Sequence, residues 1–79
     1  MKNDTAIVYK ATIDGTGNTA GEHIEVTVER EYTNPDTGRT SPPAAFISGE
    51  PQLDTAGLRR LAAVCAEAAD QLDQLTQRT

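Results

Sequence analysis

The sequence contains few of the residues on which catalysis, metal binding and covalent cross-linking depend. Its 79 residues include one cysteine, one histidine and no tryptophan. Cys65 alone cannot form an intrachain disulfide, and no set of Cys, His and carboxylate residues has the spacing of a zinc site. His23 is expected on the polar face of a strand and Cys65 on the core side of a helix, so they should not meet. We therefore predict that the protein is not an enzyme and has no cofactor, no metal and no catalytic residue.

Long apolar runs and an excess of positive charge are also missing. No stretch approaches the roughly 20 apolar residues of a membrane-spanning helix, and residues 1–4 lack the basic and apolar regions of a signal peptide. Twelve acidic side chains against seven basic ones give a formal net charge of -5, which repels nucleic-acid phosphates and anionic membrane surfaces. We expect a cytoplasmic protein with no membrane partner and no direct nucleic-acid partner.

The length of the chain predicts one small domain over residues 1–79. Such a domain buries only about 60 to 65% of the surface that its unfolded chain exposes. Domains of this size usually need disulfides, a bound metal or oligomerisation for additional support. Because the sequence offers neither of the first two, we predict a homodimer, and more generally a protein partner of unknown identity.

Alternation of apolar and polar residues predicts three strands, at about residues 5–14, 22–33 and 44–48. The first strand places apolar side chains at odd positions, namely Ile7, Tyr9, Ala11 and Ile13. The second strand has the most regular pattern, with one apolar face made of Ile24, Val26, Val28 and Tyr32. Each strand should therefore pack one face against a core and turn the other toward solvent.

The segment between the second and third strands contains the signals of a turn and of a sheet edge. Residues 34–38 read Asn-Pro-Asp-Thr-Gly, in which proline presets φ and glycine can adopt a left-handed conformation. Pro42 and Pro43 cannot donate hydrogen bonds to a neighbouring strand, so the third strand belongs at an edge of the sheet. The second strand then lies at the centre.

The last third of the chain predicts one amphipathic helix at about residues 55–77. Asp54 is placed to cap its N-terminus, and alanine, the best helix former, recurs along it. Its apolar side chains fall within one arc: Leu58, Leu61, Val64, Cys65, Ala68, Leu72 and Leu75. We expect Leu61 and Leu72 to be buried against the apolar face of the second strand. The predicted fold is therefore α+β, a three-stranded antiparallel meander in the order 1-2-3 with one C-terminal helix packed on one face.

Three glutamates on the second strand are the first candidate interaction site. Glu25, Glu29 and Glu31 share the polar face of this strand. Side chains two residues apart on such a face are about 6.8 Å apart. One interpretation is an ordinary solvated face. The other is that the row imitates nucleic-acid phosphates and blocks a nucleic-acid-binding protein.

The helix supplies the second set of candidates. Arg59 and Arg60 lie near its positive N-terminal end and Asp73 near its negative C-terminal end, so these charges oppose the helix dipole. In an antiparallel pair of helices Arg60 would be level with Asp73 of the other copy. A row of small side chains, Ala62, Ala66 and Ala69, could form such a contact or merely favour the helix. In a rival route to a dimer, the first strand pairs with the same strand of a second copy. Lys10 is the one charged side chain that would oppose pairing at this edge.

Residues 53–75 resemble the C-terminal helix of short, uncharacterised actinobacterial and actinophage proteins. The likeness lies in the run Leu58, Arg59, Arg60, Leu61, Ala62, Ala63 and in the run Glu67, Ala68, Ala69, Asp70. It implies a layout of strands followed by an alanine-rich helix and a phage or mobile-element origin, and it implies no active site.

These observations favour a non-catalytic protein-interaction module. With the resemblance, the leading hypothesis is a phage-encoded modulator of a host protein. The alternative is an acidic nucleic-acid mimic that inhibits a nucleic-acid-binding protein.

Overall fold

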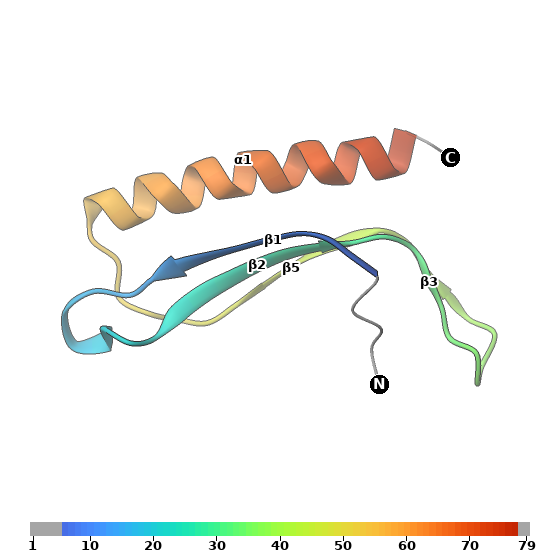
Figure 1. Cartoon of the computed structure of the whole chain (residues 1–79), viewed down its shortest axis with the longest axis horizontal. Coiled ribbons are helices and arrows are strands. Elements are labelled where there is room, and N and C mark those ends of the chain that lie inside the picture. Colours follow the sequence, from blue (N-terminus) through green and yellow to red (C-terminus); the bar gives the residue numbers. More distant parts are fainter. Residues whose placement is uncertain (1–5, 78–79) are drawn as a thin grey trace.

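The structure is a computed structural model that describes residues 6–77. It contains one three-stranded sheet, one two-stranded ribbon and one long C-terminal helix (Figure 1). In chain order the elements are β1 (Ile7–Asp14), the 3-10 turn η2 (Gly17–Thr19), β2 (His23–Glu29), β3 (Tyr32–Thr33), β4 (Thr40–Ser41), β5 (Ala44–Ser48) and α1 (Thr55–Gln77). The predicted α+β class, with an antiparallel three-stranded sheet and one C-terminal helix, is confirmed.

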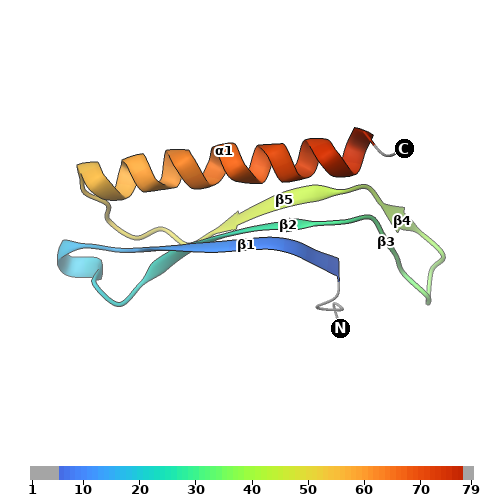
Figure 2. The same cartoon turned by 45° about the horizontal axis from the view of Figure 1, so that its top comes forward.

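The sheet has the strand order β1-β2-β5, with both pairs antiparallel. Figure 2 shows the three strands side by side and α1 running along one face of them. The predicted direct meander 1-2-3 is not matched, because the ribbon of β3 and β4 is inserted between β2 and β5. The face of the sheet opposite α1 is called the outer face below.

The predicted continuous strand over residues 22–33 is wrong at its C-terminal end. β2 ends at Glu29, and Tyr32 belongs to the separate ribbon. The last pair of β2 and β5 joins Glu29 to Ala44, and the first pair of the ribbon joins Tyr32 to Ser41. Between these pairs lie the two prolines at 42 and 43, which lack the N–H groups that a ladder needs. The sheet therefore breaks there, and the ribbon bends away from α1 (Figures 1 and 2).

The ribbon ends in the turn that the sequence predicts. The Gly38 N–H donates to the Asn34 carbonyl oxygen at 2.8 Å, and the Asp36 N–H donates to the Asn34 side-chain Oδ1 at 2.8 Å. Gly38 has a φ of 73°, which only glycine adopts without strain. The turn therefore joins β3 to β4. It does not join the predicted strands 22–33 and 44–48 directly.

β1 contains a bulge near its start. The register shifts between Ile7 and Tyr9, so that Ile7 pairs with Glu29 while Tyr9 pairs with Val28. Val8, and not Ile7, packs against the core. An extra residue in one strand moves the following side chains to the opposite face, which explains why Ile7 departs from the predicted alternation. Thr5, where the strand was predicted to begin, lies outside the described residues.

The start of α1 follows the capping signal in the sequence. The Gly57 N–H donates to the Asp54 side-chain Oδ1 at 2.8 Å, and the Leu58 N–H donates to the Asp54 carbonyl oxygen at 2.9 Å. Asp54 is therefore the N-cap, and the predicted bounds 55–77 are confirmed. Among the described residues, no helix is both long and apolar enough to cross a membrane.

The core lies between α1 and the covered face of the sheet. Its buried residues are Ile13, Ile24, Val26, Val28, Val64 and Ala68. Leu61 and Leu72 pack against this cluster but stay half-buried, so the prediction that they are buried is too strong. The residues at the centre of the contact are smaller, Val64 and Ala68, because a helix lies close to a sheet where its side chains are short.

The β1–β2 loop is held against the segment that connects β5 to α1. The Thr16 N–H donates to the Gln52 carbonyl oxygen at 2.8 Å, and the Gln52 N–H donates to the Thr19 Oγ1 at 2.7 Å. Beside this contact, Gly49 ends β5 with a φ of 104°. These hydrogen bonds fix the point at which the chain leaves the sheet and enters the helix.

Candidate interaction surface

The edge strand β5 carries the most exposed large apolar side chains on the sheet. Phe46 is 47% exposed and Ile47 is 61% exposed. Phe46 pairs with Thr27 and lies on the outer face, whereas Ile47 pairs with Val26 and lies on the face toward α1. The five residues of β5 include no charged side chain. Edge strands are usually guarded by charges or by a covering element, so this edge is unusually open to pairing.

The helix presents a second apolar surface beside the sheet. Arg60 and Glu67 both lie near Tyr9 of β1, so this side of α1 is over β1. With 100° per residue, the opposite side of the helix is turned toward β5. Its residues, the α1 flank, are Leu58, Leu61, Cys65, Ala69 and Leu72. Leu58 is 57% exposed, and none of the leucines in α1 is buried.

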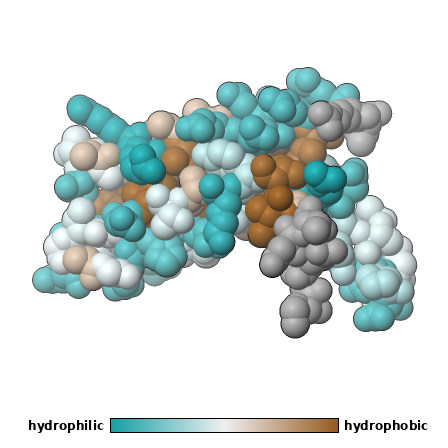
Figure 3. Space-filling model, in the orientation of Figure 1, coloured by the Kyte–Doolittle hydropathy of each residue, from teal (hydrophilic) through white to brown (hydrophobic). Residues whose placement is uncertain are grey.

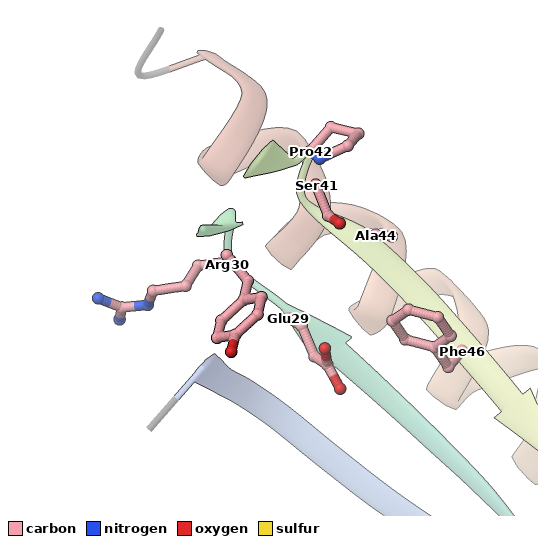
Figure 4. A pocket seen from close by; sticks show the side chains of 7 residues that line it. Glu29, Arg30, Ser41, Pro42, Ala44 and Phe46 are labelled. Atoms are coloured by element: carbon pink, nitrogen blue, oxygen red, sulfur yellow. The ribbon is translucent and has the colours of Figure 1, made fainter. Parts of the chain in front are cut away.

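A small pocket opens on the outer face, where the ribbon bends. It has a volume of about 230 Å³. Figure 4 shows that its labelled residues come from the end of β2 and the residue after it, from β4 and the proline that follows it, and from β5. The lining consists of Glu29, Arg30, Tyr32, Ser41, Pro42, Ala44 and Phe46. The outer-face pocket therefore adjoins the open β5 edge, and one of its walls is Phe46.

The view in Figure 3 shows how side chains are distributed over one face of the molecule. Hydrophilic residues cover the outward side of α1 and much of the ribbon, whereas apolar residues appear between the helix and the sheet. In this view the apolar residues of the core therefore reach the surface between the helix and the sheet.

The three glutamates of the predicted acidic row do not form a uniform solvated face. The Glu25 carboxylate lies 3.3 Å from the Lys10 ammonium nitrogen. Glu29 is 9% exposed and lines the outer-face pocket. Glu31 is exposed but follows the end of β2, where the sheet breaks. The structure thus places the three carboxylates in different environments, with Glu25 and Glu29 on β2 and Glu31 outside it.

The helix candidates lie on different sides of α1. Five of these candidates are exposed, namely Arg59, Asp73, Ala62, Ala66 and Ala69. Arg60, although exposed, lines a groove of about 370 Å³ between β1 and the start of α1, together with Thr12 and Asp14. Arg60 is therefore on the β1 side of the helix and apart from the α1 flank.

His23 and Cys65 lie on different layers of the fold. His23 is exposed and pairs with Asp14 at the end of the sheet, whereas Cys65 is half-buried on the helix. In the part of the chain that the structure describes, no three His, Cys, Asp or Glu side chains are grouped to hold a metal ion.

Within residues 6–77, Tyr9 makes the one polar contact between the sheet and the helix that changes a pKa. Desolvation raises the pKa of the Tyr9 phenol above its ordinary 10.0, and the Glu67 carboxylate, which accepts its hydrogen bond, raises it further. The positive charge of Arg60 lowers the pKa of the phenol and opposes part of this effect.

Glu67→Gln is expected to lower the pKa of Tyr9, and Arg60→Gln, a matched control on the same side of α1, is expected to raise it. The phenolate absorbance of a Tyr32→Phe background measures this, because Tyr9 is then the sole tyrosine. Since the folded pKa exceeds the unfolded one, the contribution of Tyr9 to stability is complete below about pH 10 and is lost as the pH rises above it. Equal titration midpoints in all variants would contradict the contact.

Comparisons of the chain with protein-family models, characterised proteins and solved structures gave no match.

The sequence predicted only part of this interaction surface. The prolines marked residues 44–48 as an edge strand, but the pattern did not single out Phe46 and Ile47. The signal was the absence of any charge between residues 40 and 49, which removes the usual protection of an edge.

Proposed function

We propose that the protein is a non-catalytic protein-interaction module whose binding surface is the β5 edge together with the α1 flank. The observation that carries this proposal is the exposure of Ile47, 61% on the helix side of an uncharged edge strand. A partner strand there would gain main-chain hydrogen bonds from β5 and cover apolar surface on both faces of the sheet.

A second copy of the chain is the partner that this surface fits. A two-fold axis beside β5 would join two sheets into one of six strands, with the two β5 strands antiparallel. The same axis would place two α1 helices antiparallel, flank to flank. The flank positions recur at intervals of three, four, four and three residues, and this spacing reads the same in both directions, as an antiparallel pair requires.

The surface area of the chain is consistent with such an interface. The chain exposes 5682 Å², whereas a folded monomer of 8.4 kDa exposes roughly 4,600 Å². The projecting ribbon contributes to the difference, and so does the elongated shape, 44 × 27 × 15 Å. The excess in exposed area, about 1,000 Å², is similar in size to the surface of about 800 Å² that each partner buries in an interface of standard size.

Ile47→Asp is expected to dissociate the dimer, because it places a charge in the centre of the apolar contact. Sedimentation equilibrium at micromolar concentrations measures the mass. Two matched variants test the other routes: Thr12→Asp puts the same charge on the β1 edge, and Ala66→Glu puts one on the outward side of α1. Both should remain dimeric. A monomeric wild-type protein would refute self-association. Dissociation by Thr12→Asp alone would place the interface at the β1 edge, and dissociation by Ala66→Glu alone would place it on the outward side of α1.

The nucleic-acid mimic has less support, since Glu25 is engaged by Lys10 and Glu29 is buried. A mimic needs a row of exposed charges that a basic partner can reach. A phage origin and a host protein as target remain predictions from the resemblance of the helix, and the cytoplasmic location remains a prediction from the sequence.

A further inference from the structure

The outer-face pocket has the size and position of a receptor for one side chain. Its volume of about 230 Å³ is below the about 300 to 1,000 Å³ of most small-molecule sites. It lies beside the open edge of β5, so a strand added to this edge would pass along its rim. Two residues of β5, Ala44 and Phe46, line the pocket, and the short side chain of Ala44 leaves the space next to it open.

The outward side chains of β5 alternate in size. On the outer face the strand presents Ala44, then Phe46, then Ser48, so a bulky group stands between two small ones. When two copies pair antiparallel around a two-fold axis, every cross-strand pair that lies off the axis occurs twice. If the axis passes through Ala45, each Phe46 stands opposite Ala44 of the other copy, with Cβ atoms about 4.5 to 5.5 Å apart.

We propose that Phe46 of a second copy occupies the outer-face pocket, with β5 paired in the register that sets Ala44 opposite Phe46. This inference rests on the proposed self-association and specifies its geometry. The register with Phe46 opposite Phe46 would instead place Ser48 of the other copy opposite Ala44, and the pocket would stay empty. In the proposed register the two phenylalanines are diagonal neighbours near the axis, where aromatic rings attract each other.

The same register suits the face toward α1. There Ala45 stands opposite its own copy, and Ile47 stands opposite Pro43 of the other chain. Two small residues at the axis leave room on this face for the two helices to approach each other. Ile47, 61% exposed in the single chain, would then be covered by a proline ring and by the α1 flank of the second copy.

Two single variants and their mixture test the register. Ala44→Phe should weaken self-association about tenfold, because the new ring occupies the space that Phe46 of the other copy needs. Phe46→Ala should weaken it about 30-fold, because the pocket is left unfilled. In a mixed dimer of the two variants both cross-strand pairs are again one phenylalanine and one alanine. Native mass spectrometry of the mixture should therefore show heterodimers well above the statistical fraction, bound within about threefold of the wild type.

The outcomes separate this inference from the proposed function. A dimeric wild-type protein whose variants mix statistically would overturn the register and leave self-association intact. A wild-type protein that stays monomeric at these concentrations would overturn both. Circular dichroism checks that each variant is folded, and Ala44→Leu, a smaller replacement at the same exposed edge, serves where phenylalanine disturbs the strand.

Discussion

Gly49→Ala is expected to destabilise the protein by about 2 to 6 kcal/mol. Gly49 has a φ of 104°, a conformation that costs a residue with a Cβ about 1 to 3 kcal/mol. A Cβ at this position would in addition overlap the His23 carbonyl oxygen at the start of β2, and relieving such an overlap costs about as much again. Because a domain of this length has a stability of roughly 4 to 12 kcal/mol, the variant should lose much of it.

Gly21→Ala is the matched control for this prediction. Gly21 has the same φ of 104°, but no atom lies within 4 Å of the position that its Cβ would take. It should therefore show the conformational cost alone. Urea denaturation of the two variants, with the slope held constant, gives the difference in free energy of unfolding. Equal losses would show that β2 does not approach Gly49 as closely as the structure has it.

Ile13→Ala is expected to cost about 2 to 5 kcal/mol, the range for removing most of a fully buried aliphatic side chain. Ile13 is 1% exposed, pairs with Ile24 and belongs to the core cluster between the sheet and α1. A cavity there cannot collapse easily, because the helix above and the strand beside it are fixed by their own hydrogen bonds. The midpoint of urea denaturation should fall accordingly.

Leu58→Ala removes a similar side chain from a position that is 57% exposed. Its cost should stay within about 1 kcal/mol, in part because alanine favours the helix. Both variants are compared at a protein concentration where the chain is monomeric, so that a loss of dimer does not enter the result. Similar costs at both positions would contradict the placement of the core between β1, β2 and α1.

The interaction surface shows why the site was harder to predict than the fold. The sequence marks residues 44–48 as an edge strand, but how much of Ile47 is exposed depends on where α1 lies across the sheet. The helix could cover β5 as well as β1 and β2. In the structure its Glu67 side contacts Tyr9 of β1, and this position leaves the β5 edge uncovered.

Local physics determined most of the elements of this protein. The alternation around Val26 fixed β2 and its apolar face, because a strand turns successive side chains to opposite sides. Asp54 and the alanine-rich stretch after it fixed the start and length of α1, since capping and helix propensity act within a few residues. The Asn34–Gly38 turn and the two prolines likewise acted locally.

Tertiary structure alone decided the features that depend on packing between distant segments. The bulge that moves Ile7 out of line and the break of the sheet after Glu29 arise from pairing with other strands. The burial of Ala68 instead of Leu61 depends on how closely α1 approaches the sheet. The sequence could not give these because each is a compromise among contacts far apart in the chain, whereas periodicity and capping report on neighbours only.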